Sequence, residues 1–159
     1  MTARTATDVT NFLKPTLDRL YAEFNYPDSA TDPIQIVRRF ERADDREVVG
    51  FCASALAFGR VASVLQSIER VVAVMGDRPA AYVRAFDPRA DGRAFSGFVH
   101  RWTRGVDVVA LLWLLKQMMD RSGSIEQFFA DGYSAADEDV GPAIDSFSAR
   151  ALGLDLGAV

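Results

Sequence analysis

Apolar side chains recur at helical spacing along most of the chain, and the period-two alternation of strands is almost absent. The clearest stretch is residues 61–75, where apolar positions follow the i, i+3, i+4, i+7 pattern throughout. This periodicity predicts an all-α fold of about seven or eight helices with no sheet. The expected helices cover residues 15–24, 34–40, 45–58, 61–75, 79–86, 106–121, 125–130 and 142–152.

Capping signals set the expected helix ends. Asp32 followed by Pro33 is a typical N-terminal cap, and Ser124 with Gln127 forms a capping-box pattern. Asp77 is expected to cap the short helix that follows it. Gly59 suits the left-handed position that ends a helix, and residues 87–97 are expected to form a loop.

The segment 45–58 is apolar on most of its circumference, which is typical of a helix at the centre of a domain. Cys52 lies within this segment and is therefore expected to be a small core residue. A single cysteine and a single histidine exclude a disulfide framework and a multi-histidine metal site. No metal site and no cofactor are predicted.

The chain has 159 residues, of which 49% are hydrophobic, and this size and composition predict one domain over residues 1–159. The longest apolar run, Val108 to Leu115, is too short to cross a bilayer, so no membrane partner is expected. The N-terminus has no apolar secretory segment, which favours a cytoplasmic protein. Because no phosphate-binding loop or hydrolase motif occurs, catalytic residues stay unassigned and enzyme activity stays open.

The charge is unevenly distributed. The chain has a net charge of −4, but residues 58–104 contain eight basic and four acidic side chains. This middle third is a candidate basic surface for nucleic acid. The alternative is that its arginines are scattered over solvated helix faces.

Several short motifs are similar to a bacterial family catalogued as domain of unknown function family 2400. They are Leu20-Tyr21, Asn25, Asp32-Pro33-Ile34, Arg39-Phe40, Asp45-x-Glu47, residues 53–60 (ASALAFGR), residues 98–103 (FVHRWT), Asp107 and residues 123–129. The chain resembles the N-terminal portion of that family. The helix order also resembles the helix-hairpin-helix DNA glycosylases.

The resemblance implies a DNA-repair-like scaffold with weak nucleic-acid binding. Family members continue beyond the equivalent of Val159, and the hairpin and catalytic aspartate of the glycosylases have no counterpart here. The chain is therefore expected to be a fragment or a degenerate member, and not catalytic on its own.

The candidate nucleic-acid-binding residues are Arg60, His100, Arg101 and Arg104. Exposed arginines at these positions are expected to contact phosphates rather than bases. Alternatively, they hydrogen-bond helix-end carbonyls or pair with acids such as Asp45 and Asp107.

A second functional reading is a structural or protein-interaction domain with no nucleic-acid role. Self-association through exposed apolar surface is expected, either from residues 106–121 or from the tail near Leu152 and Leu154.

Overall fold

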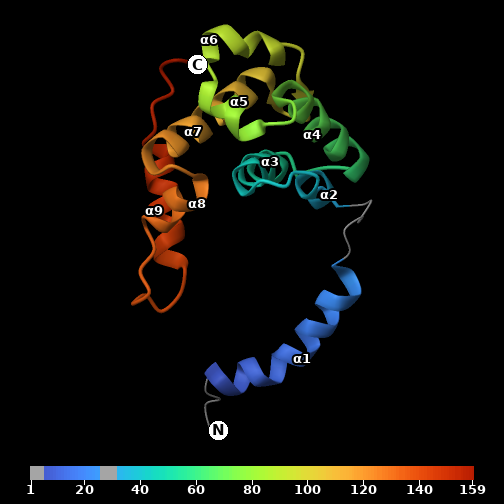
Figure 1. The fold of residues 1–159 in the computed structure, drawn as a ribbon, viewed down its shortest axis with the longest axis vertical. Coiled ribbons are helices and arrows are strands. Elements are labelled where there is room, and N and C mark those ends of the chain that lie inside the picture. The colour runs from blue at the N-terminus through green and yellow to red at the C-terminus, as the bar shows by residue number, and fades with distance from the viewer. Residues whose placement is uncertain (1–5, 26–31) are drawn as a thin grey trace.

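A computed structural model of the protein describes residues 6–25 and 32–159, with side chains from residue 12 onward (Figure 1). Nine α-helices lie in these ranges: α1 Ala6–Phe24, α2 Ile34–Arg38, α3 Ala43–Ala55, α4 Val61–Met75, α5 Pro79–Ala85, α6 Pro88–Asp91, α7 Gly105–Ser122, α8 Ile125–Ala130 and α9 Gly141–Leu152. A 3₁₀-helix covers Gly92–Phe95, and two short strands, β1 Val99–His100 and β2 Thr103–Arg104, precede α7. The prediction of an all-α fold is confirmed.

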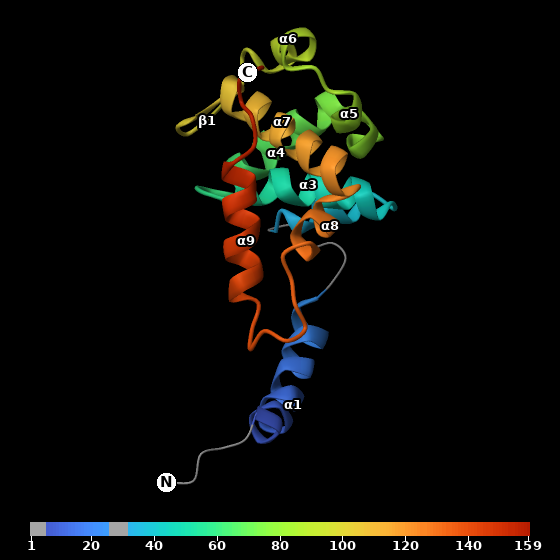
Figure 2. The same ribbon diagram turned by 90° about the vertical axis from the view of Figure 1, so that its left-hand side faces the viewer.

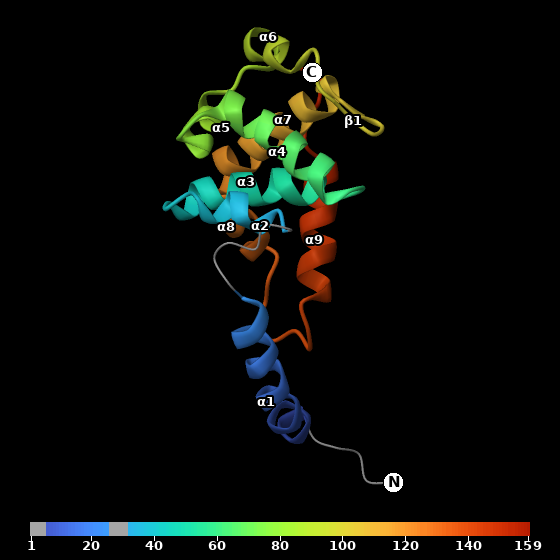
Figure 3. The ribbon, with the colours of Figure 1, turned by 90° about the vertical axis from the view of Figure 1, so that its right-hand side faces the viewer.

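Helix α3 lies at the centre of the packed helices, as its apolar circumference predicts. It contacts α2, α4, α5 and α8, which surround it in Figures 2 and 3. Val48, Val49 and Cys52 are fully buried in the core. Burial also raises the pKa of the Cys52 thiol to about 12, so this cysteine is a core residue and not a thiolate nucleophile.

Two of the expected caps are present. The Oδ1 atom of Asp32 accepts a hydrogen bond from the backbone N–H of Ile34 at 2.9 Å. The Oγ atom of Ser124 accepts one from the N–H of Gln127, also at 2.9 Å. The expected cap at Gly59 is wrong in its position, because α3 ends at Ala55 with Leu56 as its C-cap. Gly59 does have a positive φ of +111°, but it lies in the connection between α3 and α4.

The expected cap of α5 by Asp77 is wrong. No side chain at the N-cap position of α5 accepts a hydrogen bond from the helix. Instead, the Oδ1 atom of Asp45, on α3, accepts the N–H of Ala80 at 2.8 Å. A tertiary contact therefore satisfies this helix end, and Asp45 becomes 2% exposed.

The expected loop over residues 87–97 is also wrong, because α6 and the 3₁₀-helix fill most of it. Asp87 caps α6 by accepting the N–H groups of Arg89 and Ala90 at 2.8 and 3.4 Å. Pro88 occupies the first helical turn, where its missing N–H costs nothing. Asp87-Pro88 is the same Asp-Pro start signal as Asp32-Pro33.

Helix α1 extends away from the other helices (Figures 1 and 2). Apolar side chains spaced as on one helix face are exposed along it: Leu13, Leu17, Leu20 and Phe24. No helix in the described part of the chain has the length and apolar character needed to cross a membrane.

The two segments that were expected to expose apolar surface are largely packed. Helix α7 buries Leu112 and Leu115 completely, and Leu154 is only 6% exposed. Leu152 is the exception in the tail, with 88% of its surface exposed. Among the described side chains, helix α1 exposes six large apolar ones, whereas α7 exposes only Val106.

Candidate functional site

The prediction that the chain contains no sheet is wrong in one place. Strands β1 and β2 form an antiparallel hairpin that contacts α4 and α7 and protrudes at one side of the packed helices (Figure 2). Val99 pairs with Arg104 and His100 pairs with Thr103. Arg101 begins the two-residue turn with φ +58°, a conformation that non-glycine residues adopt rarely. The sequence has no Asn-Gly or Asp-Gly signal at this turn, so tertiary contacts must hold it.

His100 anchors the hairpin to α4. Its ring is 4% exposed, its Nδ1 lies 2.8 Å from the Oγ of Ser67, and its Nε2 lies 3.1 Å from the carbonyl oxygen of Phe58. Both ring nitrogens therefore have protein partners inside the fold. Although His100 was expected to contact nucleic acid, its position makes it a positioning residue for the hairpin.

Trp102 lies at the tip of the hairpin and stacks on Phe58. The two ring centroids are 4.5 Å apart and the rings are inclined by only 8°. Trp102 nevertheless remains 75% exposed. The sequence reasoning did not assign Trp102 to the site, although an aromatic residue among arginines in the stretch 101–104 is a signal that could have found it.

The three candidate arginines lie close in the chain to this stacked pair. Arg60 follows the Gly59 turn at the N-terminal cap of α4, and Arg104 occupies the N-terminal cap of α7. The Arg101 guanidinium lies against the backbone of Gly59, where an added Cβ would come within 2.9 Å of Nε. The structure thus brings all three arginines to one edge of the molecule.

Within the described ranges, the guanidinium groups of Arg60, Arg101 and Arg104 form neither a hydrogen bond nor an ion pair. All three residues are exposed. The two acids expected as their partners, Asp45 and Asp107, bind other groups and not these guanidinium groups. Asp45 faces α5, and the Oδ2 of Asp107 accepts the backbone N–H of Arg104 at 2.7 Å.

The C-terminal end of the hairpin is fixed by a close backbone approach. An added Cβ on Gly105 would lie 2.0 Å from the carbonyl oxygen of Phe95, so a larger residue does not fit without moving the backbone. The 3₁₀-helix that ends at Phe95 therefore packs directly against the start of α7.

A polar hollow of about 270 Å³ lies beside the hairpin. It is lined by Ser63, Gln66, Ser67, Arg70, Val99, His100 and Arg101. Arg70 is held in place within this lining, because its Nη2 donates to the carbonyl oxygen of Gly97 at 2.8 Å. Its guanidinium also lies over the ring of Phe98, 5.0 Å from the centroid, so Arg70 contributes to the fold.

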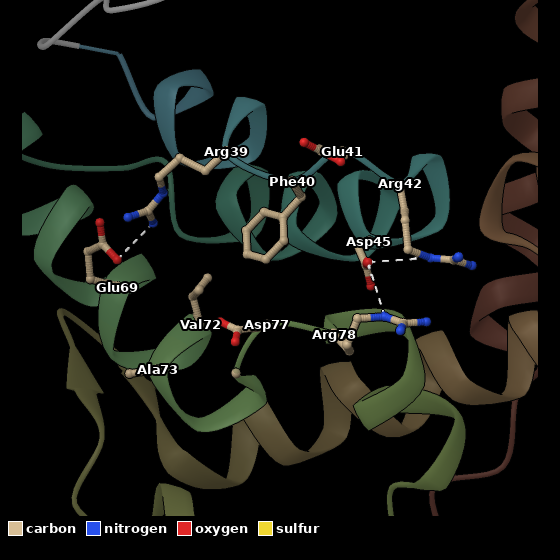
Figure 4. Close-up of a pocket in the computed structure, with 11 residues that line it drawn as sticks. Arg39, Phe40, Glu41, Arg42, Asp45, Glu69, Val72, Ala73, Asp77 and Arg78 are labelled. Atoms are coloured by element: carbon tan, nitrogen blue, oxygen red, sulfur yellow. Dashed lines mark hydrogen bonds and ion pairs between the residues drawn. The ribbon is translucent and has the colours of Figure 1, made fainter.

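A larger pocket of about 650 Å³ is also lined with arginines (Figure 4). It lies where the residues around the α2–α3 connection face α4 and the start of α5. Arg39 pairs with Glu69 at 2.9 Å. Asp45 lies 3.7 Å from the Nε of Arg42 and 3.9 Å from the Nε of Arg78.

Arg42 has a second acidic partner, Asp44, at 3.0 Å. The hydrogen bond from Arg42 holds the pKa of the Asp44 carboxyl below its ordinary value. Each arginine of this pocket thus has an acidic partner. Among the described residues, no group of three or more His, Cys, Asp or Glu side chains is arranged to hold a metal ion.

Comparison with known proteins identifies a family but no function. The family model described as "Protein of unknown function (DUF2400)" matches residues 32–155, which is more than half of the chain. No curated protein and no solved structure matches the chain significantly. The match begins at the capping residue before α2 and includes α3, the Gly59 turn, the hairpin and α7. The chain belongs to this DUF2400 family of proteins of unknown function.

Proposed function

We propose that the edge formed by residues 58–60 and the β1–β2 hairpin binds the phosphate backbone of nucleic acid. The observation that carries the proposal is the set of three exposed arginines, Arg60, Arg101 and Arg104, whose guanidinium groups have no acidic partner in the described structure. Guanidinium groups are well suited to phosphate recognition because they are permanently charged and offer several donors.

Two helix ends support the same role. Arg60 and Arg104 stand at the N-terminal caps of α4 and α7, where the helix dipole is positive and a cation is unfavourable. Their position is therefore not explained by helix stability. A bound phosphate would gain both from the arginines and from the positive ends of two long helices.

The resemblance to helix-hairpin-helix DNA glycosylases supports nucleic acid as the ligand. The proposed role is binding as a repair-like scaffold over the single domain 1–159. The proposed location is the cytoplasm. Contacts to phosphates imply weak binding with little sequence preference and a strong dependence on salt.

Arg104→Ala tests the proposal, with Arg42→Ala as the matched control. Arg104→Ala is expected to weaken DNA binding, to lower the slope of log affinity against log salt by about one unit, and to leave folding intact. Arg42→Ala is expected to leave the slope unchanged, because Asp44 already neutralises that charge. Absence of binding to single- and double-stranded DNA at about 50 mM salt overturns the proposal, since electrostatic attachment is strongest at low salt.

The exposed stripe on α1 favours a second candidate function, self-association with another copy of the chain. Leu17 and Leu20 are 57% and 41% exposed, and such a stripe is normally buried against a partner. Leu17→Glu with Leu20→Glu is expected to shift the sedimentation coefficient of an oligomer to that of a monomer. A wild-type chain that is monomeric at high concentration contradicts this candidate.

A further inference from the structure

The stacked pair of Phe58 and Trp102 leaves one aromatic face open to solvent. One face of Trp102 is covered by Phe58 at 4.5 Å, and the residue is still 75% exposed. Large exposed aromatic rings are unfavourable in water, and hydrophobic packing alone would place Trp102 inside. The fold instead holds this ring in a defined orientation at the surface.

The orientation of Trp102 is fixed by contacts on both sides of it. His100, two residues earlier, is buried and bonded to Ser67 and to the carbonyl of Phe58. Two residues later, Arg104 is fixed by pairing with Val99 and by its N–H bond to Asp107. The ring is therefore oriented before any ligand arrives, which reduces the entropy lost on binding.

We infer that Trp102 is a stacking platform for an unpaired nucleobase, so that the edge prefers single-stranded over double-stranded nucleic acid. This inference rests on the proposed phosphate-binding function and adds the part of the ligand that lies between the phosphates. The neighbours of Trp102 in the hairpin favour a nucleotide over an apolar protein segment. Arg101 and Arg104 have no acidic partner for their guanidinium groups among the described residues, and Arg101 lines the polar hollow beside the hairpin.

The preference for single strands follows from geometry. In a duplex the bases are stacked on one another, so their faces are not open to a side chain at the surface. In a single strand each base has a free face, and an aromatic platform binds it with little regard to sequence. The arginines would then hold the phosphates on either side of the stacked base.

The direct test follows the fluorescence of Trp102. The chain has two tryptophans, and Trp113→Phe in the full-length chain leaves Trp102 as the only one. A short oligothymidylate is expected to quench this fluorescence at about 50 mM salt. The matched control is Trp102→Phe, in which the remaining Trp113 should show no quenching, because its indole N–H already donates to the carbonyl oxygen of Asp155.

Binding measurements then separate stacking from phosphate contact. Trp102→Ala is expected to weaken binding of labelled oligothymidylate about tenfold and to leave binding of a duplex unchanged. Trp102→Phe should retain most of the single-strand affinity, because it keeps an aromatic face. Tyr133→Ala, which removes another exposed aromatic ring far along the chain, should change neither affinity.

An abasic strand of the same length completes the test. The wild-type chain should bind it about as weakly as Trp102→Ala binds oligothymidylate. If the arginine variants weaken binding but Trp102→Ala does not, the stacking inference is overturned and the phosphate-binding proposal stands. If no nucleic acid binds at all, both are overturned, and the exposed ring is then better explained as a protein contact.

Discussion

The protein contains two arginine-rich regions that differ in one respect. In the pocket of Figure 4, Arg39, Arg42 and Arg78 all have carboxylates within 4 Å. At the hairpin edge, Arg60, Arg101 and Arg104 have no acidic partner in the part of the chain that the structure describes. The number of arginines is the same, but of these two regions only the hairpin edge has arginines without an acidic partner among the described residues.

This difference shows that local charge in the sequence is a poor guide to anion binding. The pocket is the larger concavity, at about 650 Å³, yet its acids neutralise the arginines and Asp45 is committed to Ala80. The hollow beside the hairpin edge is smaller, at about 270 Å³, but the arginines of the edge have no acidic partner among the described residues and are free to meet a ligand. Pairing, and not cavity size, identifies the candidate site.

Removing Asp45 should produce the largest effect. Asp45→Ala is expected to destabilise the fold by about 2 kcal/mol, because the buried N–H of Ala80 loses its acceptor. The change should also leave Arg78 without a carboxylate. Denaturant unfolding measures the first effect, and the salt dependence of DNA binding measures the second.

Glu69→Gln is the control for this prediction, because it breaks a half-exposed pair with Arg39 and should cost less than about 1 kcal/mol. If ion pairing is what prevents the arginines of the pocket from binding DNA, Asp45→Ala should also steepen the salt dependence of DNA binding. A destabilised variant with an unchanged salt dependence would show that pairing alone does not separate the two regions.

A smaller effect is expected at Arg101, where two variants should differ in stability but not in DNA affinity. Its φ of +58° is strained for any residue with a Cβ, so Arg101→Gly should be more stable than Arg101→Ala by about 1 kcal/mol. Both variants should lose the same amount of DNA affinity, because both lack the guanidinium. Thermal melting and binding titrations together check this prediction. Equal stability of the two variants would mean that the turn relaxes in solution.

The smallest expected effect concerns pH. Arg42 lowers the pKa of Asp44 in the folded state below the ordinary value of 3.8, so the pair stabilises the fold above that value. This contribution is lost as the pH falls through the lowered pKa. Asp44→Asn should therefore make unfolding less dependent on pH between about pH 5 and pH 2.

The matched control for the pH prediction is Arg104→Ala. Because Arg104 has no carboxylate partner, this variant should follow the wild-type pH profile. Denaturant titrations at several pH values measure both. A profile for Asp44→Asn that coincides with the wild type would show that the exposed pair contributes nothing measurable.

Local patterns were sufficient to predict most of the helices and the central place of α3. Periodicity, the Asp32 and Ser124 caps and the Gly59 turn all depend on interactions within a few residues of chain. The overlooked α6 follows the same rule, since Asp87 caps it locally. The contacts that determine these elements join residues that are close together in the sequence.

The candidate site depended on contacts between distant positions. The sequence makes His100 a candidate nucleic-acid-binding residue. In the structure it is buried and its ring is hydrogen-bonded to Ser67, 33 positions away. The hairpin has no turn signal of its own. Trp102 stacks on Phe58, which precedes α4 in the sequence, whereas Trp102 follows it.

Residue order is enough to predict an all-α fold, its central helix and most helix ends, because those properties follow from short-range hydrogen bonds and spacing. Which charges are neutralised depends instead on how the helices pack. Asp45 meets Arg78 and Ala80, more than thirty positions along the chain. In the described part of the chain, by contrast, no acid pairs with the guanidinium group of Arg60, Arg101 or Arg104. Ion pairing depends on distance in space, which residue order along the chain does not specify.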